Sequence, residues 1–184
     1  MSHTTHIEDR TAAAVLDAAA AVLATRSDAS MAEIAGVAGV TRTTLYRHFA
    51  SREALVQALA ALALKEAAEL IEKARLETVP VEEGLARLVR AFLSVGDRYL
   101  VLVHEQVRLE PAEVERALAA PTRALLERGQ REGRLSQDHP VEWLMEALGG
   151  LLRAALRHSA AADLGVEAAA AAVITLFLDG AAAR

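Results

Sequence analysis

The chain contains 184 residues and no cysteine, carries a formal net charge of −5, and is 53% hydrophobic although only 3% of its residues are aromatic. The lack of cysteine excludes disulfides, thiolate metal sites and a cysteine nucleophile and fits a reducing cytoplasm, while the negative charge excludes a broadly basic nucleic-acid surface. Because strands favour β-branched and aromatic residues, this alanine-rich chain is expected to be all-α, with the length of one domain or two small ones.

Apolar spacing and helix caps predict the first elements. Residues 1–8 show no apolar period and are expected to form a disordered tail. A first helix is predicted from about Asp9 to Thr25. Ser30 and Glu33 have the spacing of a capping box, in which a hydroxyl and a carboxylate bond free amides at a helix start, so a second helix should begin at Met31.

The later elements begin at similar signals. Gly39 can adopt the left-handed turn that ends the second helix, and Thr41 should cap a third helix that runs through Phe49. Ser51 should cap the fourth helix. The remaining helices are predicted over Val81 to about Arg98, Pro111 to Glu132 with a kink at Pro121, Val141 to His158, and Gly165 to Asp179.

Neither long apolar stretch supports a membrane or secretory segment. The stretch Thr11 to Thr25 contains Asp17 and follows two acids instead of a basic leader, unlike a signal peptide. The run Ala168 to Leu178 is shorter than the roughly 20 residues that a membrane-spanning helix needs. We therefore expect no membrane partner.

Positive charge is concentrated next to the predicted turn. Between Thr41 and Arg52 the chain has three arginines and a histidine but no acid. Two short helices joined by a glycine turn, the second opening in hydroxyl and basic residues, form a helix-turn-helix that can read DNA in the major groove. We predict such a unit over Ser30 to Phe49. On spacing alone, an ordinary set of helical hairpins remains an equal alternative.

The predicted DNA contacts lie on and beside the third helix. Its first-turn side chains would reach base edges, and neighbouring groups would bind phosphate. Leu45 and Phe49 should face the opposite way, into the core. The predicted base-reading residues are Arg42, Thr43 and Thr44; the predicted phosphate contacts are Ser30, Tyr46, His48 and Arg52; Thr41 and Arg47 complete the DNA-binding set.

The run MAEIAGVAGVTRTTLYRHFASREALVQAL, Met31 to Leu59, resembles the DNA-binding domain of the TetR family of repressors. The match includes the Ala-Gly-Val turn, the Thr-Leu-Tyr-x-His-Phe stretch and the Ser-x-Glu-x-Leu start of the next helix. Between Leu23 and Ser30 the chain is shorter than the family's usual turn and lacks its Gly-aromatic pair. The resemblance implies about nine helices per subunit, a two-fold dimer and a ligand pocket in the C-terminal part.

This resemblance implies two domains: DNA-binding over residues 9–52, and ligand-binding and dimerisation over residues 53–184. Gly129 to Asp138 looks like the family's hinge before the last two helices. The effector should be small and apolar or amphipathic. Trp143 could line its pocket or simply anchor its helix in the core. The candidate pocket residues are Phe92, Tyr99, His104, Arg108 and Trp143.

The last two predicted helices are apolar on more faces than one subunit can cover, since the final helix has no charge between Glu167 and Asp179. We therefore predict a homodimer built on these helices. The predicted interface residues are Leu144, Ala147, Leu148, Gly150, Leu151, Ala154, Ala169, Ala172, Val173, Ile174 and Phe177.

The chain shows no set of residues that would make an enzyme. His104 and Glu105 begin a zinc-protease-like string, but Arg108 stands where the second histidine is required. His3 and His6 lack further ligands, so neither a metal nor a cofactor is expected. The expected function is a ligand-responsive repressor that binds a palindromic double-stranded DNA operator. The alternatives are a regulator without small-molecule control and a helical protein-interaction module.

Overall fold

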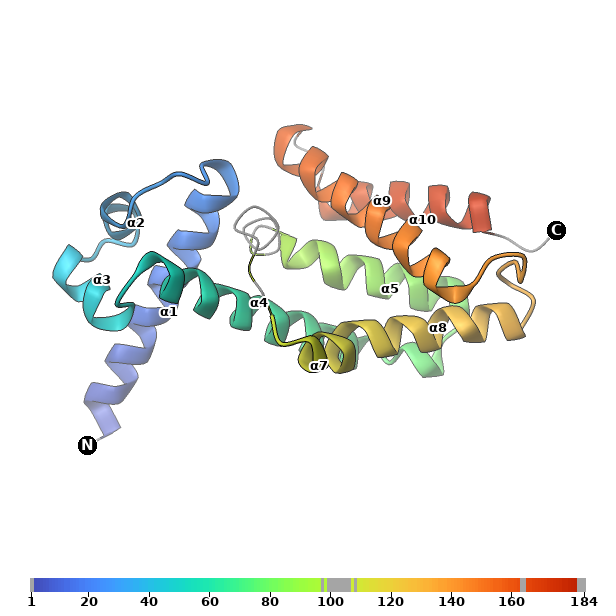
Figure 1. The fold of residues 1–184 in the computed structure, drawn as a ribbon, viewed down its shortest axis with the longest axis horizontal. Helices are drawn as coiled ribbons and strands as arrows, with labels where there is room; N and C mark the ends of the chain where they lie inside the picture. The colour runs from blue at the N-terminus through green and yellow to red at the C-terminus, as the bar shows by residue number, and fades with distance from the viewer. Residues whose placement is uncertain (1, 97, 99–106, 108, 163–164, 182–184) are drawn as a thin grey trace. The chain divides into compact units, whose positions relative to one another are not determined.

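The computed structural model describes residues 2–96, 98, 107, 109–162 and 165–181 (Figure 1). The regular elements of these residues are all helices, which confirms the predicted all-α class. They are α1 (Ser2–Thr25), α2 (Met31–Val37), α3 (Arg42–His48), α4 (Arg52–Ala74), the 3₁₀ turn η1 (Leu76–Thr78), α5 (Val81–Ser94), α7 (Pro111–Val114), the π-helical turn η2 (Glu115–Ala119), α8 (Ala120–Arg131), α9 (Val141–Ala162) and α10 (Val166–Ala181).

The chain divides into two compact units, and one boundary lies inside α4, between Ala63 and Leu64. The predicted domain boundary after Arg52 lies earlier. The difference arises because Leu55, Val56 and Leu59 of α4 belong to the same buried cluster as α1, α2 and α3. The first part of α4 is thus a core element of the helix-turn-helix unit.

In the first unit, α1 begins at Ser2 instead of near Asp9, so the predicted disordered tail differs from the structure. Extending an existing helix adds a hydrogen bond per residue without a new nucleation step, and this explains why helix continues into a polar segment. Val15, Ala19 and Leu23 of α1 are fully buried in the cluster that also holds α2 and α3.

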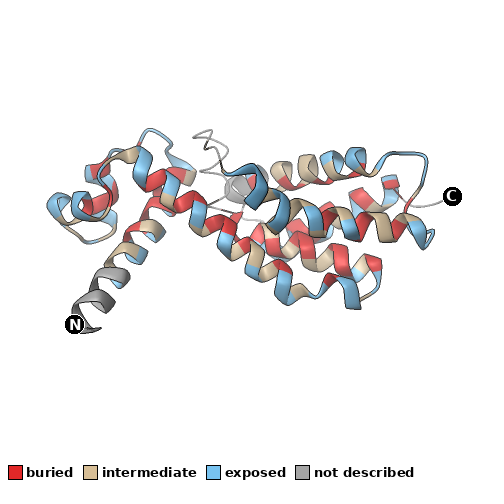
Figure 2. Cartoon of the chain, turned by 60° about the horizontal axis from the view of Figure 1, so that its bottom comes forward, coloured by how far each residue is buried: buried red, intermediate tan, exposed pale blue. Residues whose placement is uncertain are grey.

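The second unit is built on α5, α8, α9 and α10 (Figure 2). Its core is leucine-rich, and α5 packs against each of the other three helices. Glycine permits one close approach: a Cβ at Gly84 of α5 would lie 2.8 Å from Leu125 Cδ1 of α8. At the surface, Arg90 of α5 donates to Glu167 of α10 at 2.9 Å.

The predicted kink at Pro121 takes the form of a π-helical turn. Proline has no N–H for the carbonyl four residues earlier, and its ring crowds that carbonyl. The helix widens just before it, so that the Ala120 N–H bonds the Glu115 carbonyl five residues back. Directly after the proline, the Thr122 hydroxyl donates to the Leu118 carbonyl at 2.7 Å.

Gly129 of α8 lies at a second close contact, and its substitution tests the packing there. A Cβ there would lie 2.7 Å from Leu135 Cδ1, whereas a Cβ at Gly36 of α2 meets nothing within 4 Å. We expect Gly129→Ala to lower the free energy of unfolding by about 1 to 3 kcal/mol through overpacking. Gly36→Ala should raise it by up to about 1 kcal/mol, because alanine favours helix.

Chemical denaturation of both variants checks this pair. A Gly129→Ala protein as stable as the wild type would mean that Leu135 does not pack tightly on α8.

Candidate nucleic-acid interface

The interface begins with the turn between α2 and α3. Gly39 has a φ of +68°, in the left-handed region that other residues rarely adopt. Its N–H bonds the Gly36 carbonyl at 3.2 Å, and the Val40 N–H bonds the Ala35 carbonyl at 3.0 Å. These two bonds end α2 and fix where α3 starts, as the glycine turn in the sequence predicts.

Both helices carry the caps that the sequence predicts. The Ser30 hydroxyl accepts from the Glu33 N–H at 3.3 Å, and the Glu33 carboxylate accepts from the Ser30 N–H at 2.8 Å, which completes the capping box. The Thr41 hydroxyl accepts from the Thr44 N–H at 3.1 Å and caps α3. These local bonds hold the two helices in place without a ligand.

The caps change the expected role of the cap side chains. The Ser30 hydroxyl also donates its proton to Glu33, at 2.9 Å, so it cannot donate to a phosphate while the box is intact. The hydroxyls of Thr41 and Thr44 lie 2.9 Å apart, and one of them donates to the other. Only one proton of this threonine pair remains for DNA. The phosphate contact of Ser30 stays a prediction, and it would require the capping box to open.

Glu33 makes the box sensitive to acid. The Ser30 N–H, then Arg26 and the Ser30 hydroxyl, stabilise the carboxylate and lower the pKa of Glu33 from 4.5 to about 2. The pKa of Glu33 is lower in the folded protein than in the unfolded chain. The carboxylate therefore stabilises the folded state fully above about pH 4.5, and this stabilisation is lost as the pH falls through about 2.

We expect Glu33→Gln to lower the melting temperature at pH 7 and to have little effect near pH 2. Glu72→Gln, at an exposed position of α4, is the control. Thermal denaturation followed by circular dichroism measures both. An equal loss at the two pH values would contradict the carboxylate's role.

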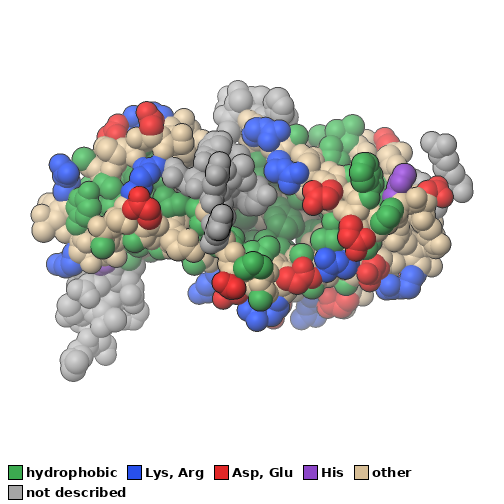
Figure 3. All heavy atoms as spheres, in the orientation of Figure 1, with side chains coloured by type: hydrophobic (Ala, Val, Ile, Leu, Met, Phe, Trp, Pro, Cys, Tyr) green, Lys and Arg blue, Asp and Glu red, His purple; other side chains and the backbone are tan. Residues whose placement is uncertain are grey.

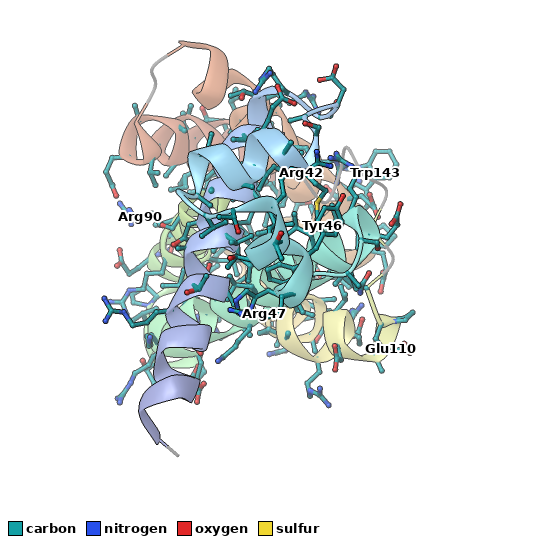
Figure 4. All side chains as sticks on the ribbon, turned by 90° about the vertical axis from the view of Figure 1, so that its left-hand side faces the viewer. Arg42, Tyr46, Arg47, Arg90, Glu110 and Trp143 are labelled. Carbon is teal, nitrogen blue, oxygen red and sulfur yellow. The ribbon has the colours of Figure 1, made fainter. Side chains whose placement is uncertain are left out.

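One face of α3 is open to a partner. Arg42, Thr43 and Arg47 are exposed, Tyr46 is 42% exposed, and no described residue bonds their polar groups. In Figure 4, which looks onto this end of the first unit, Arg42, Tyr46 and Arg47 lie along α3 on the side facing the viewer. Leu45 and Phe49 are buried in the core, as predicted.

Two residues predicted to contact phosphate also have a place in the fold. Arg52 donates to the Ala29 and Ser27 carbonyls, both at 2.5 Å, and so ties the start of α4 to the turn between α1 and α2. The His48 Nε2 is buried without a hydrogen-bond partner among the described residues, beside the Phe49 ring. The Arg52 guanidinium is thus engaged by carbonyls and one imidazole nitrogen of His48 is turned inward, and the phosphate contacts of both residues stay predictions.

The predicted effector pocket is only partly within the described residues. Phe92 is half-buried on α5. Trp143 is 65% exposed on α9, so the alternative in which it anchors its helix in the core is wrong, and its pocket role stays a prediction. The 3.6-residue period allowed either inward role, but Leu144 and Leu148 occupy the inner stripe. Tyr99, His104 and Arg108 lie outside the described residues.

The predicted dimer residues divide into two groups. Leu144, Leu148, Ala169, Val173 and Phe177 are buried within the subunit, so they cannot present a surface to a partner and leave the interface prediction. The others are exposed or half-buried: Ala147, Gly150, Leu151, Ala154, Ala172 and Ile174.

Sequence reasoning missed Leu176 and gave Trp143 other roles, although both are apolar side chains on the outside of these helices. Trp143 of α9 and Leu176 of α10, the latter 63% exposed, are open to solvent. Leu176 lies four residues after Ala172, a spacing that places both on one helix face and could have identified it. Hydrophobic side chains are visible along α9 in Figure 3.

Two further observations concern membrane spans and metal sites. Among the described residues, none of the helices is both long and apolar enough to cross a membrane. The same residues contain no group of three or more histidines and acids placed to hold a metal ion. A capped helix-turn-helix with an exposed basic face defines the class instead: a helix-turn-helix protein of the DNA-binding type.

Comparison with known proteins gives the family. Residues 15–59 match the family model described as bacterial regulatory proteins, tetR family. Over these residues the chain is similar to the TetR family. It is 39% identical over 88 residues to the HTH-type transcriptional repressor LfrR of Mycolicibacterium smegmatis, an alignment that covers 48% of this chain and 47% of LfrR. The chain thus matches about half the length of this curated relative.

Solved structures are similar over more of the chain. The TetR-like regulator LfrR from Mycobacterium smegmatis, in complex with proflavine, aligns with a TM-score of 0.76 and 27% identity over 93% of this chain and 96% of that one. The TetR-family regulator PfmR from Thermus thermophilus aligns with a TM-score of 0.70 and 25% identity over 90% of this chain and 97% of that one. Both relatives are named as transcriptional regulators and neither as an enzyme.

Proposed function

We propose that this protein is a transcriptional repressor that binds a palindromic operator as a homodimer and is released by a small apolar or amphipathic effector. The observation that carries the proposal is the α3 face, where Arg42, Thr43, Tyr46 and Arg47 are exposed on a helix whose ends are fixed by caps. Arginine can bond a guanine edge with two donors, and threonine can contact a thymine methyl group.

The dimer is supported by the outer faces of α9 and α10. A side chain as large as Trp143 at 65% exposure, with Leu176 at 63%, is costly to leave in water. Gly149 and Gly150 lie inside α9, where glycine weakens a helix, and the only side chain near their missing Cβ atoms is Arg153 of the same helix. A partner helix that approaches closely would explain these residues.

The effector part of the proposal rests on relatives more than on described residues. LfrR has been solved with proflavine, and proflavine is therefore the first probe. An aliphatic amphiphile of similar size is the second, because the core of the second unit is mainly leucine, valine and alanine. Either ligand would act by favouring a state with lower affinity for the operator.

The test has two stages. Sequence selection from random duplexes, followed by gel shifts across a salt series, should give a palindromic site bound by two subunits. Isothermal calorimetry then measures each probe with and without that operator. Because coupling is reciprocal, operator should weaken effector binding by the factor by which effector weakens operator binding. Absence of any selected site would refute the repressor; equal effector affinity in both states would refute control by that effector.

A further inference from the structure

The arginines of the first unit fall into two groups by their partners. Arg26 pairs with Glu33 at 2.8 Å, Arg98 pairs with Asp17, and Arg52 donates to two carbonyls. The exposed arginines without an ion pair or hydrogen bond to a described residue are Arg10, Arg42 and Arg47. Two of these three lie on α3. The third, Arg10, lies on α1 and has no part in the helix-turn-helix.

Arg10 is nevertheless next to the turn of that motif. It lines a surface hollow of about 350 Å³ with Thr11 and Ala14 of α1 and with Ala38 and Val40 of the α2–α3 turn. Val40 directly precedes Thr41, the cap of α3, so the hollow adjoins the start of the proposed reading helix.

The chemistry of the hollow suits one kind of occupant. Apart from Arg10, the described side chains that line it are small, and Arg10 is exposed and is the one charged side chain among them. Glu8 and Asp9 precede Arg10 in the sequence, but from Arg10 to Leu16 the helix contains no acid, and Asp17, which follows, is paired with Arg98. A guanidinium beside a shallow space lined by small side chains can take a phosphate oxygen and the sugar next to it.

We propose that this hollow seats a phosphate of the DNA backbone, bound by Arg10, at the edge of the major groove that α3 enters. The inference rests on the proposed function. A contact from α1 positions the duplex and carries no base information, because it reaches the backbone and not a base edge. It extends the DNA footprint beyond the helix-turn-helix to a residue that precedes the motif.

The experiment measures the salt dependence of binding by the full chain. Arg10→Ala is compared with wild type on the selected operator and on a mixed-sequence duplex of equal length. Log K falls as log salt rises, and each lost phosphate contact makes this slope shallower by about 0.9. A dimer that loses one contact per subunit should therefore have a slope shallower by about 1.8. Affinity should fall by the same factor on both duplexes, and the selected sequence should not change. Arg10→Lys should keep most of the slope.

Arg116→Ala is the matched control, because it removes the same charge from an exposed position of the second unit. Melting temperatures equal to wild type exclude unfolding as the cause. A slope for Arg10→Ala equal to that of Arg116→Ala overturns the inference, and so does a changed sequence preference, which would make Arg10 a base reader. If wild type itself binds no duplex, the proposed function fails and not this contact alone.

Discussion

Ala154→Glu and Ile174→Glu are each expected to convert the protein to a monomer and to abolish operator binding together with it. Both positions are half-buried on α9 and α10, among the outer residues that the subunit leaves uncovered. A carboxylate closed into a helix-helix contact without a partner loses its hydration, which costs several kcal/mol. In a dimer, binding at one half-site holds the second subunit close to the other half-site. A monomer lacks this advantage, which is worth about 10²- to 10⁴-fold in affinity.

Sedimentation equilibrium and gel shifts on the same samples measure the two effects. Ala112→Glu places the same charge at an exposed site on α7 and should leave both assembly and binding unchanged. Dimers in both variants at wild-type affinity would place the interface away from the outer faces of α9 and α10.

Arg42→Ala and Thr43→Ala are expected to relax sequence preference, each by about 1 to 3 kcal/mol at one base position of each half-site. Both side chains are exposed on the first turn of α3 and make no bond to a described residue that would have to break on binding. Selection from random duplexes, compared position by position with wild type, measures the change. An unchanged preferred sequence for Arg42→Ala would remove it from the base-reading set.

Arg52→Ala provides the contrast for that experiment. Its guanidinium bonds the carbonyls of Ala29 and Ser27, so removing it leaves two acceptors without their donor. We expect a lower melting temperature and a loss of affinity that is the same for all sequences. Substitution of a residue that contacts base edges should show the opposite pattern, with an unchanged melting temperature and an altered sequence preference.

The parts of the fold that depend on short-range chemistry were predictable from the sequence. The Ser30 and Glu33 capping box, the left-handed Gly39 and the irregular turn before Pro121 are each decided within a few residues. A hydroxyl three residues before a carboxylate, or a missing N–H, has the same consequence in most surroundings. These features therefore appear where the sequence places them.

The parts that depend on tertiary contacts were not predictable in the same way. Helical spacing places Trp143 and Leu144 on adjacent stripes of α9 but does not say which stripe meets the core, and only Leu144 is buried. Likewise, the basic character of Arg52 and His48 suggested phosphate contacts, whereas their nitrogens are directed to carbonyls or turned inward. Composition gives the charge of a segment; packing decides which of its groups remain available.

α4 is a single unbroken helix of 23 residues, with Leu55 buried in the first unit and Ile71 buried in the second. A residue inserted at an exposed position such as Ala61 would turn all that follows by about 100° around the helix axis. Ile71 would then lie on a different side of the helix relative to Leu55, although both are buried. The residue count of α4 therefore keeps the buried residues of its two halves in register along one helix.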